Sequence, residues 1–169
     1  MERPAPDEYI PYYESYISLV PQQPILAVLE EQLAELREWV ESVPLERETY
    51  RYAPGKWSLR EALGHVVDSE RIFAYRACAI ARGERQSLPG YEQDDYVAES
   101  AADHRRLSDL LEELEWQRRG NVLLFRGLPE EAWRRRGIAN NDPVSVRALV
   151  YIMAGHVTHH LRVFRERYQ

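Results

Sequence analysis

The chain has 169 residues, which is the size of one domain, and a chain of this length buries enough apolar surface to fold without disulfides or a structural metal. Its net charge of −6, from 28 acidic and 22 basic side chains, excludes the strongly basic face that binding to a nucleic-acid backbone needs. The single cysteine excludes an internal disulfide and suits a reducing compartment, so we expect a cytoplasmic protein; no apolar run is long enough to span a membrane.

Residues 1–21 are rich in proline and tyrosine, and the prolines continue to Pro24. Proline interrupts both helices and sheets, so this segment is predicted to be a mostly extended arm. Its tyrosines carry too much apolar area to remain in water, and we expect the arm to pack on the body of the protein or on a second subunit. They are Tyr9, Tyr12, Tyr13 and Tyr16.

The bundle is expected to occupy residues 22–169, and its first helix covers about residues 22–43. Apolar residues recur there at steps of three and four, which predicts one buried stripe. The second helix starts with a capping box, in which Ser58 is the N-cap and Glu61 is the third helical residue. This helix extends to about Arg82, before Gly83, and its broad apolar surface places it centrally.

Residues 84–97 are predicted to be a connection of 14 residues. At about 3.3 Å per residue they reach ~46 Å, more than the ~37 Å of the second helix. The third helix, about residues 98–126, can therefore run parallel to the second. The fourth covers about residues 144–168, with Asp142 or Ser145 as its N-cap. No segment alternates like a strand, so the prediction is an all-α protein, a four-helix bundle.

The histidines carry the main chemical signal. His156 and His160 continue the buried stripe of the fourth helix one turn apart, about 5–6 Å between Cβ atoms. His65 lies in an apolar run of the second helix. Three neutral imidazoles on two helices can bind Zn, Ni, Fe or Mn and leave coordination positions open. His159 points about 100° away from His160, so it could support the ligands from outside the cluster or lie at the surface, and we favour the surface or a dimer contact. His104 lies in a polar segment, where solvent is its expected environment.

The histidines also have a purely structural interpretation. A histidine on an apolar face is usually a hydrogen-bonded core residue, and an isolated His-x-x-x-His pair often arises by chance. Three buried imidazoles without a shared partner would nevertheless lose hydration at each ring. The spacing alone leaves the metal site and the plain helical scaffold about equally supported.

Two segments resemble the DinB-like superfamily, in the YfiT-type metalloenzyme group. They are YAPGKWSLREALGHVVDSE, from Tyr52 to Glu70, and PVSVRALVYIMAGHVTHH, from Pro143 to His160. The resemblance covers about residues 22–168, which is nearly the whole chain. It implies a four-helix bundle of up-down-down-up topology with one divalent metal held by His65, His156 and His160. Zn or Ni is favoured, and Fe or Mn is possible.

The neighbours of this site have competing interpretations. Asp68 is a candidate to accept a histidine N–H or to act as a base, against a slightly favoured solvent-facing role. Glu70 lies on the inward stripe and is expected to pair with an inward arginine, for which Arg118 is a candidate. Such a pair could be structural, could support the metal site, or could bind an anionic substrate. Cys78 is about 20 Å from His65 along the helix, too far to be a ligand or nucleophile. Tyr52 and Trp57 are expected to pack the end of the bundle.

The resemblance implies a metal-dependent enzyme that acts on a small molecule, by thiol transfer or related transferase or hydrolase chemistry. Its relatives include transferases that use a low-molecular-weight thiol, bacillithiol or mycothiol, and maleylpyruvate isomerases. The alternative is a non-catalytic metal-binding or stress-response module on the same bundle. A homodimer is expected from the tyrosine-rich arm and from the relatives, and neither a nucleic acid nor a membrane is an expected partner.

Overall fold

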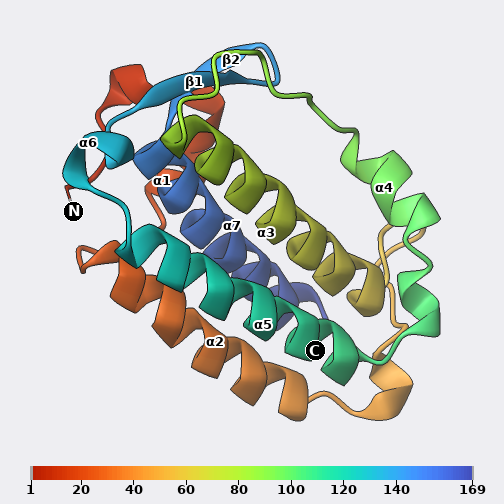
Figure 1. Ribbon diagram of the computed structural model, residues 1–169. Coiled ribbons are helices and arrows are strands. Elements are labelled where there is room, and N and C mark those ends of the chain that lie inside the picture. Colours follow the sequence, from red (N-terminus) through yellow and green to blue (C-terminus); the bar gives the residue numbers. More distant parts are fainter. Residues whose placement is uncertain (1, 169) are drawn as a thin grey trace.

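The computed structural model describes residues 2–168, so Met1 and Gln169, which end the expected arm and bundle ranges, lie outside the described residues. Four long helices form the body of the molecule (Figure 1). They are α2 (Ile25–Glu41), α3 (Leu59–Ala81), α5 (Leu107–Arg126) and α7 (Val146–Arg167). α2 and α7 run in one direction and α3 and α5 in the other (Figure 1). The predicted all-α bundle of up-down-down-up topology is therefore confirmed.

Serine side chains start the two helices that matter most for the site. Ser58 accepts a hydrogen bond from the Glu61 N–H at 3.0 Å, and the Glu61 carboxylate accepts one from the Ser58 N–H at 2.8 Å. This is the predicted capping box of α3. Ser145, rather than Asp142, caps α7, because its Oγ accepts the Ala148 N–H at 3.0 Å. Both caps fix the register in which the following histidines face inward.

The connection between α3 and α5 runs along the bundle from one end of α3 to the other (Figure 1), which makes these two helices parallel. The helix expected from residue 98 starts later, at Leu107. Residues 93–99 instead form a separate helix, α4 (Gln93–Glu99), and Ala101 then adopts a left-handed φ of 52° that ends it. A 3-10 turn follows, and its Ala102 packs against Gly64 of α3, where an added Cβ would lie 3.1 Å away.

A short hairpin corrects the expectation that the chain has no strand. β1 (Arg136–Ala139) pairs antiparallel with β2 (Asp142–Ser145). Asn140 and Asn141 form the turn with φ values of 54° and 65°, and asparagine is among the residues that tolerate this conformation. Four-residue strands are too short to show alternation, which is why the pattern missed them. Leu88 of the connection bonds to the hairpin and ties it to the end of α3.

The N-terminal arm wraps on the body, mainly on α7, and contains more helix than expected. Two 3-10 turns precede α1 (Glu14–Ile17), because the nine residues between Pro11 and Pro21 contain no proline. Glu8 binds Arg147 of α7 through both carboxylate oxygens. The backbone of Tyr16 crosses α7 at Gly155, where any Cβ would lie 2.1 Å from the Tyr16 carbonyl oxygen. The arm therefore packs directly against the backbone of α7 at Gly155.

One short helix, α6 (Glu130–Trp133), joins α5 to the hairpin. Among the described residues no helix combines the length and the hydropathy that crossing a membrane would require.

Candidate metal centre and its cavities

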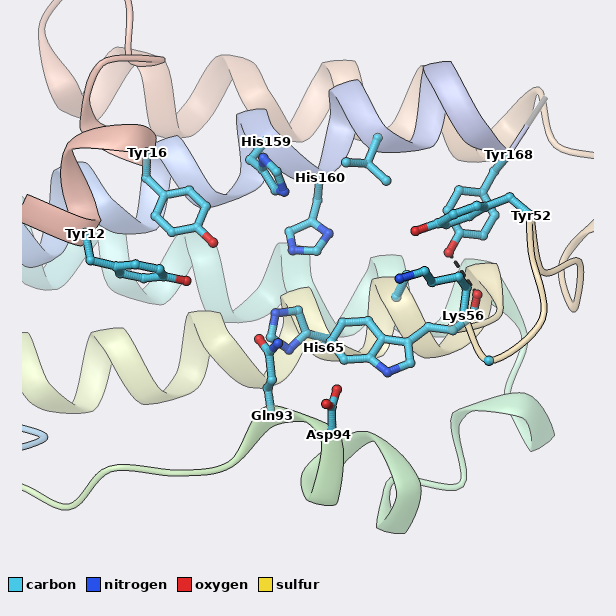
Figure 2. Close-up of a pocket in the computed structure, with 14 residues that line it drawn as sticks. Tyr12, Tyr16, Tyr52, Lys56, His65, Gln93, Asp94, His159, His160 and Tyr168 are labelled. Carbon is cyan, nitrogen blue, oxygen red and sulfur yellow. Dashed lines mark hydrogen bonds between the residues drawn. The ribbon is translucent and has the colours of Figure 1, made fainter.

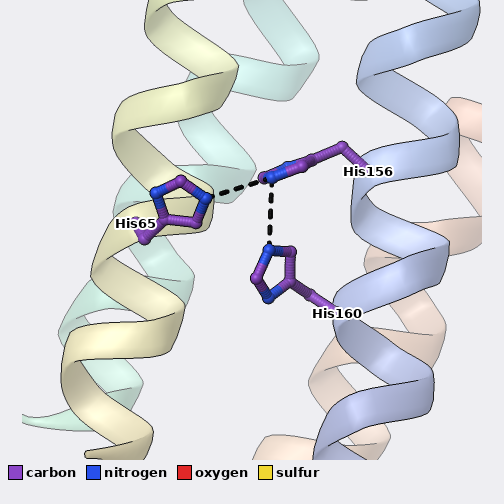
Figure 3. Close-up of side chains that lie close together, drawn as sticks. All are labelled: His65, His156 and His160. Atoms are coloured by element: carbon purple, nitrogen blue, oxygen red, sulfur yellow. Dashed lines mark hydrogen bonds between the residues drawn. The ribbon is translucent and has the colours of Figure 1, made fainter. Parts of the chain in front are cut away.

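Three imidazoles meet between α3 and α7 (Figure 3). The Nε2 atom of His156 lies 3.1 Å from Nε2 of His65 and 3.2 Å from Nε2 of His160. One nitrogen from each ring lies within 4.8 Å of the others, and the three form the set of possible metal ligands found among residues 2–168. His65 comes from the second turn of α3, and the other two lie one turn apart on α7, as the sequence pattern predicted.

The three rings are buried and electrically neutral. His65 and His156 are 4% and 6% exposed, and His160 is partly buried. Burial lowers the pKa of His65 to about 4. Burial, together with repulsion from the neighbouring imidazoles, lowers the pKa values of His156 and His160 well below the usual range. Each ring therefore keeps a lone pair on one nitrogen at neutral pH, the state that binds a metal.

The geometry fits one divalent ion better than it fits hydrogen bonds. A neutral imidazole nitrogen carries either one proton or one lone pair, so protons alone leave one of the two contacts of His156 Nε2 unsatisfied. Nitrogen ligands of a tetrahedral ion at about 2.0–2.1 Å lie about 3.3 Å from one another. The two distances in the cluster are close to that value.

Aromatic rings hold the imidazoles in place. The Trp57 indole lies 4.9 Å from the His65 ring, and Phe73 lies 5.9 Å from the His156 ring, measured between centroids. Phe164 lies 5.9 Å from the His160 ring. Nδ1 of His160 is buried and has no hydrogen-bond partner among the described residues, so on that side packing orients the ring.

A cavity of about 420 Å³ opens beside the cluster. Figure 2 shows side chains from the arm, α3, α4 and α7 pointing into it. His65 and His160 form part of its wall, and polar groups surround them. The wall includes Tyr12, Tyr16, Tyr52, Lys56, Trp57, Gln93, Asp94, His159 and Tyr168. Because hydroxyl, ammonium and carboxylate groups face the same space, the cavity suits a small polar molecule.

A second cavity, of about 270 Å³, reaches the other side of the cluster. Tyr12, Tyr16, His65 and Gln93 border both cavities, whereas His156 borders this one alone. The remaining wall comes from the arm, α3, the connection and the hairpin turn: Tyr13, Phe73, Arg76, Tyr91, Glu92 and Asn140. The imidazole cluster thus borders a cavity on each of two sides.

The structure tests the predicted positions of two further histidines and of two aromatic residues. His104 is exposed, as expected. His159 is half-buried in the wall of the larger cavity, 5.5 Å from the Tyr16 ring, which corrects its placement at the surface or in a dimer contact. It lies outside the ligand cluster. Tyr52 and Trp57 do more than pack the end of the bundle, because both line the same cavity.

The structure does not bring Asp68 to the cluster. Its carboxylate binds Arg71 at 3.2 Å on the outer side of α3, and among the described residues it makes no hydrogen bond to an imidazole. Burial raises the pKa of Asp68, although Arg71 opposes this effect. Cys78 is a free thiol on α3 and lines neither cavity.

Glu70 and Arg118 form the expected buried pair. Their side chains are fully buried, and two hydrogen bonds of 2.8 Å join them between α3 and α5. Arg118 also donates to Gln32 of α2 at 3.0 Å, and Gln32 donates to the Ala154 carbonyl of α7 at 2.7 Å. This polar network joins all four long helices and makes no hydrogen bond to the imidazoles, so the pair acts as support for the bundle.

Several residues near the cluster were missed by the sequence analysis. Ser69 lies 3.5 Å from Nε2 of His65 and 2.9 Å from the Tyr91 hydroxyl. Its spacing of four residues from His65 could have identified it, because i and i+4 share a helix face. Tyr91, and Gln93 and Asp94 at the start of α4, come from the segment that was predicted to be a plain connection, where no periodic pattern points to a particular residue.

A four-helix bundle of up-down-down-up topology, with three histidines facing one another in its core, defines a class of proteins. A comparison with family models identifies that class. The family model for the DinB superfamily matches residues 28–164, so the chain belongs to the DinB superfamily.

Two solved structures share the fold. One is YfiT from Bacillus subtilis, described as a probable metal-dependent hydrolase with an unusual four-helix bundle topology. Its sequence is 18% identical to this chain, and the match has a TM-score of 0.77 and covers 98% of this chain and 90% of that one. The other is a mycothiol-dependent maleylpyruvate isomerase, 13% identical, with a TM-score of 0.68. That match covers 86% of this chain and 61% of the isomerase. No protein of curated function matches the sequence.

Proposed function

We propose that this protein is a divalent-metal-dependent enzyme that acts on small molecules, with His65, His156 and His160 as the metal ligands. The observation that carries the proposal is the convergence of three Nε2 atoms beside a cavity of about 420 Å³. Structural metal sites are closed, whereas catalytic ones keep a position open to water or substrate. The cavity therefore favours an enzyme over a module that holds a metal without catalysis.

An all-imidazole ligand set suits Zn or Ni first, and Fe or Mn also accept it. A bound ion would supply Lewis-acid chemistry, polarising a substrate carbonyl and lowering the pKa of a water or thiol. The protein supplies the neutral imidazoles, the aromatic rings that hold them, and a wall of tyrosine hydroxyls for substrate binding. His159, half-buried next to this wall, is placed to exchange a proton with a bound substrate.

Thiol transfer or hydrolysis is the reaction class that we favour. The solved structures with this fold are described as a probable metal-dependent hydrolase and a mycothiol-dependent isomerase, which supports both chemistries. The one cysteine, Cys78, lines neither cavity, so a thiol reaction would take its thiol from a low-molecular-weight cosubstrate. The proposal includes a cytoplasmic location, which the low cysteine content and the lack of an internal disulfide favour.

Equilibrium titration with Zn²⁺ tests the ligand assignment. We expect the wild type to bind one ion tightly and His160→Ala to lose more than about 100-fold in affinity, since replacing even a group that only supports a ligand costs 10–100-fold. His159→Ala is the matched control, because it removes the adjacent imidazole from the same helix and should keep the ion. Circular dichroism should show both variants folded. Loss of binding in His159→Ala with retention in His160→Ala would refute the assignment.

A further inference from the structure

Arg76, on α3, is a buried cation without a carboxylate partner. Its residue is 4% exposed, and among residues 2–168 no acidic oxygen lies within ion-pairing distance of its guanidinium. Its Nη2 donates a hydrogen bond to the Pro89 carbonyl oxygen at 2.6 Å. The other well-buried arginines differ: Arg118 binds both oxygens of Glu70, and Arg147 binds both oxygens of Glu8. A single bond to a neutral carbonyl does not offset the removal of a charge from water.

Arg76 lines the smaller cavity, and that cavity borders the imidazole cluster. The wall of this 270 Å³ space contains Arg76 together with His65 and His156. Arg76 follows His65 by 11 residues, about three helical turns, so both side chains lie on one face of α3, about 16 Å apart along the axis. The arginine side chain leans toward the helix N-terminus, that is, toward His65. Because one cavity borders Arg76, His65 and His156, a molecule that extends along this cavity can touch both ends.

The chemistry of this cavity selects an organic anion. The Nε and Nη1 atoms of Arg76 are not sealed from solvent in the way that Nη1 of Arg147 is, so they remain available to a ligand. Burial raises the pKa values of Tyr13 and Tyr91, which keeps both phenols uncharged beside the cation. Glu92 borders the cavity but is exposed and forms no ion pair with Arg76 among the described contacts. The aromatic wall of Tyr13, Phe73 and Tyr91 suits carbon rather than a bare inorganic ion.

We propose that Arg76 binds a carboxylate of the substrate, which lies along the smaller cavity with its reacting end at the three histidines. The planar fork of a guanidinium matches the two oxygens of a carboxylate and pairs with them through parallel hydrogen bonds. The substrate class is then a small organic acid. The part of this proposal that concerns the reacting end rests on the proposed function; the anion site itself does not.

Calorimetric titration of the metal-free protein with benzoate tests the anion site. Benzoate places a carboxylate on an aromatic ring, and benzamide has the same shape without the charge. We expect benzoate to bind the wild type at least tenfold more tightly than benzamide, and Arg76→Gln to reduce its affinity to that of benzamide. Arg82→Gln, which removes an exposed arginine six residues further along the chain, should bind benzoate like the wild type.

Several results would overturn the anion site. They are equal binding of benzoate and benzamide by the wild type, unchanged benzoate affinity in Arg76→Gln, and tighter binding of inorganic phosphate than of benzoate. Arg76→Lys keeps the charge and should retain benzoate better than the glutamine variant. Should both variants unfold, the Nε–H resonance of Arg76 must still shift when benzoate is added to the wild type, and no shift refutes the proposal.

The same titrations separate this proposal from the proposed function. Benzoate binding with no uptake of Zn²⁺ would keep the anion site and remove the metal-dependent enzyme. Zn²⁺ uptake without benzoate binding would keep the metal centre and remove the anion site. We expect both ligands to bind the wild type, and Arg76→Gln to leave the Zn²⁺ affinity within about threefold.

Discussion

Three neutral imidazoles in the core make the metal-free protein sensitive to acid. In the unfolded chain a histidine has a pKa of about 6.5, whereas burial lowers that of His65 to about 4. As the pH falls below 6.5, the histidines are protonated in the unfolded chain but stay neutral in the folded one, so the free energy of unfolding falls. The loss from His65 continues to about pH 4 and amounts to about 3 kcal/mol, with His156 and His160 adding to it.

Urea denaturation of the metal-free protein at pH 7 and pH 5 measures this effect. Replacement of His65 by leucine should flatten the pH dependence, while His104→Ala, which removes an exposed histidine, should leave it unchanged. A wild-type stability that does not change between pH 7 and pH 5 would contradict the burial of neutral imidazoles.

The Glu70–Arg118 pair is predicted to be far more sensitive than the ion pairs on the surface. Glu70→Gln leaves the fully buried Arg118 without its counter-ion, and breaking a buried pair costs about 3–5 kcal/mol. The exposed pair of Glu30 and Arg126 is the control, because Glu30→Gln should cost less than about 1 kcal/mol. Thermal denaturation of both variants measures the difference, and equal losses would show that the network does not support the bundle.

At the scale of elements, the arm and α7 depend on one glycine. In Gly155→Ala the new Cβ would overlap the Tyr16 backbone, so the arm must move away and the protein should lose stability. Gly120 on α5 has open space around it, and Gly120→Ala should stabilise by up to about 1 kcal/mol through helix propensity. Thermal denaturation and limited proteolysis of the arm test both. A Gly155→Ala variant as stable as Gly120→Ala would show that the arm does not rest on α7.

The sequence predicted the long helices and the three inward histidines because helical periodicity and capping are local signals. The box of Ser58 and Glu61 set the phase of α3, and the stripe through Met153 set that of α7. The cavities were not predicted. They are bordered by Tyr16 from the arm, Tyr91 and Asp94 from the connection, and Asn140 from the hairpin turn. Tertiary packing alone brings these segments together, and no spacing along the chain encodes it.

At the scale of the whole molecule, the state of assembly is still a prediction. Three of the four tyrosines of the arm are buried or partly buried against the rest of the chain, and Tyr12 is exposed. Two large apolar side chains on α5, Trp116 and Leu123, are 64% and 66% exposed. We predict a homodimer in which such surface is covered. Sedimentation equilibrium should give about twice the 19.9 kDa of one chain. A mass near 20 kDa that does not change with protein concentration would contradict the dimer.

The central claim is that one divalent ion sits among His65, His156 and His160. Anomalous diffraction from crystals of Zn²⁺-loaded protein, collected on both sides of the metal absorption edge, tests it directly. We predict one strong anomalous peak about 2.0–2.1 Å from the Nε2 atom of each of the three rings, with no protein ligand from His159 or Asp68. A peak elsewhere, or three histidines that keep hydrogen-bond distances with no peak between them at saturating Zn²⁺, would contradict it.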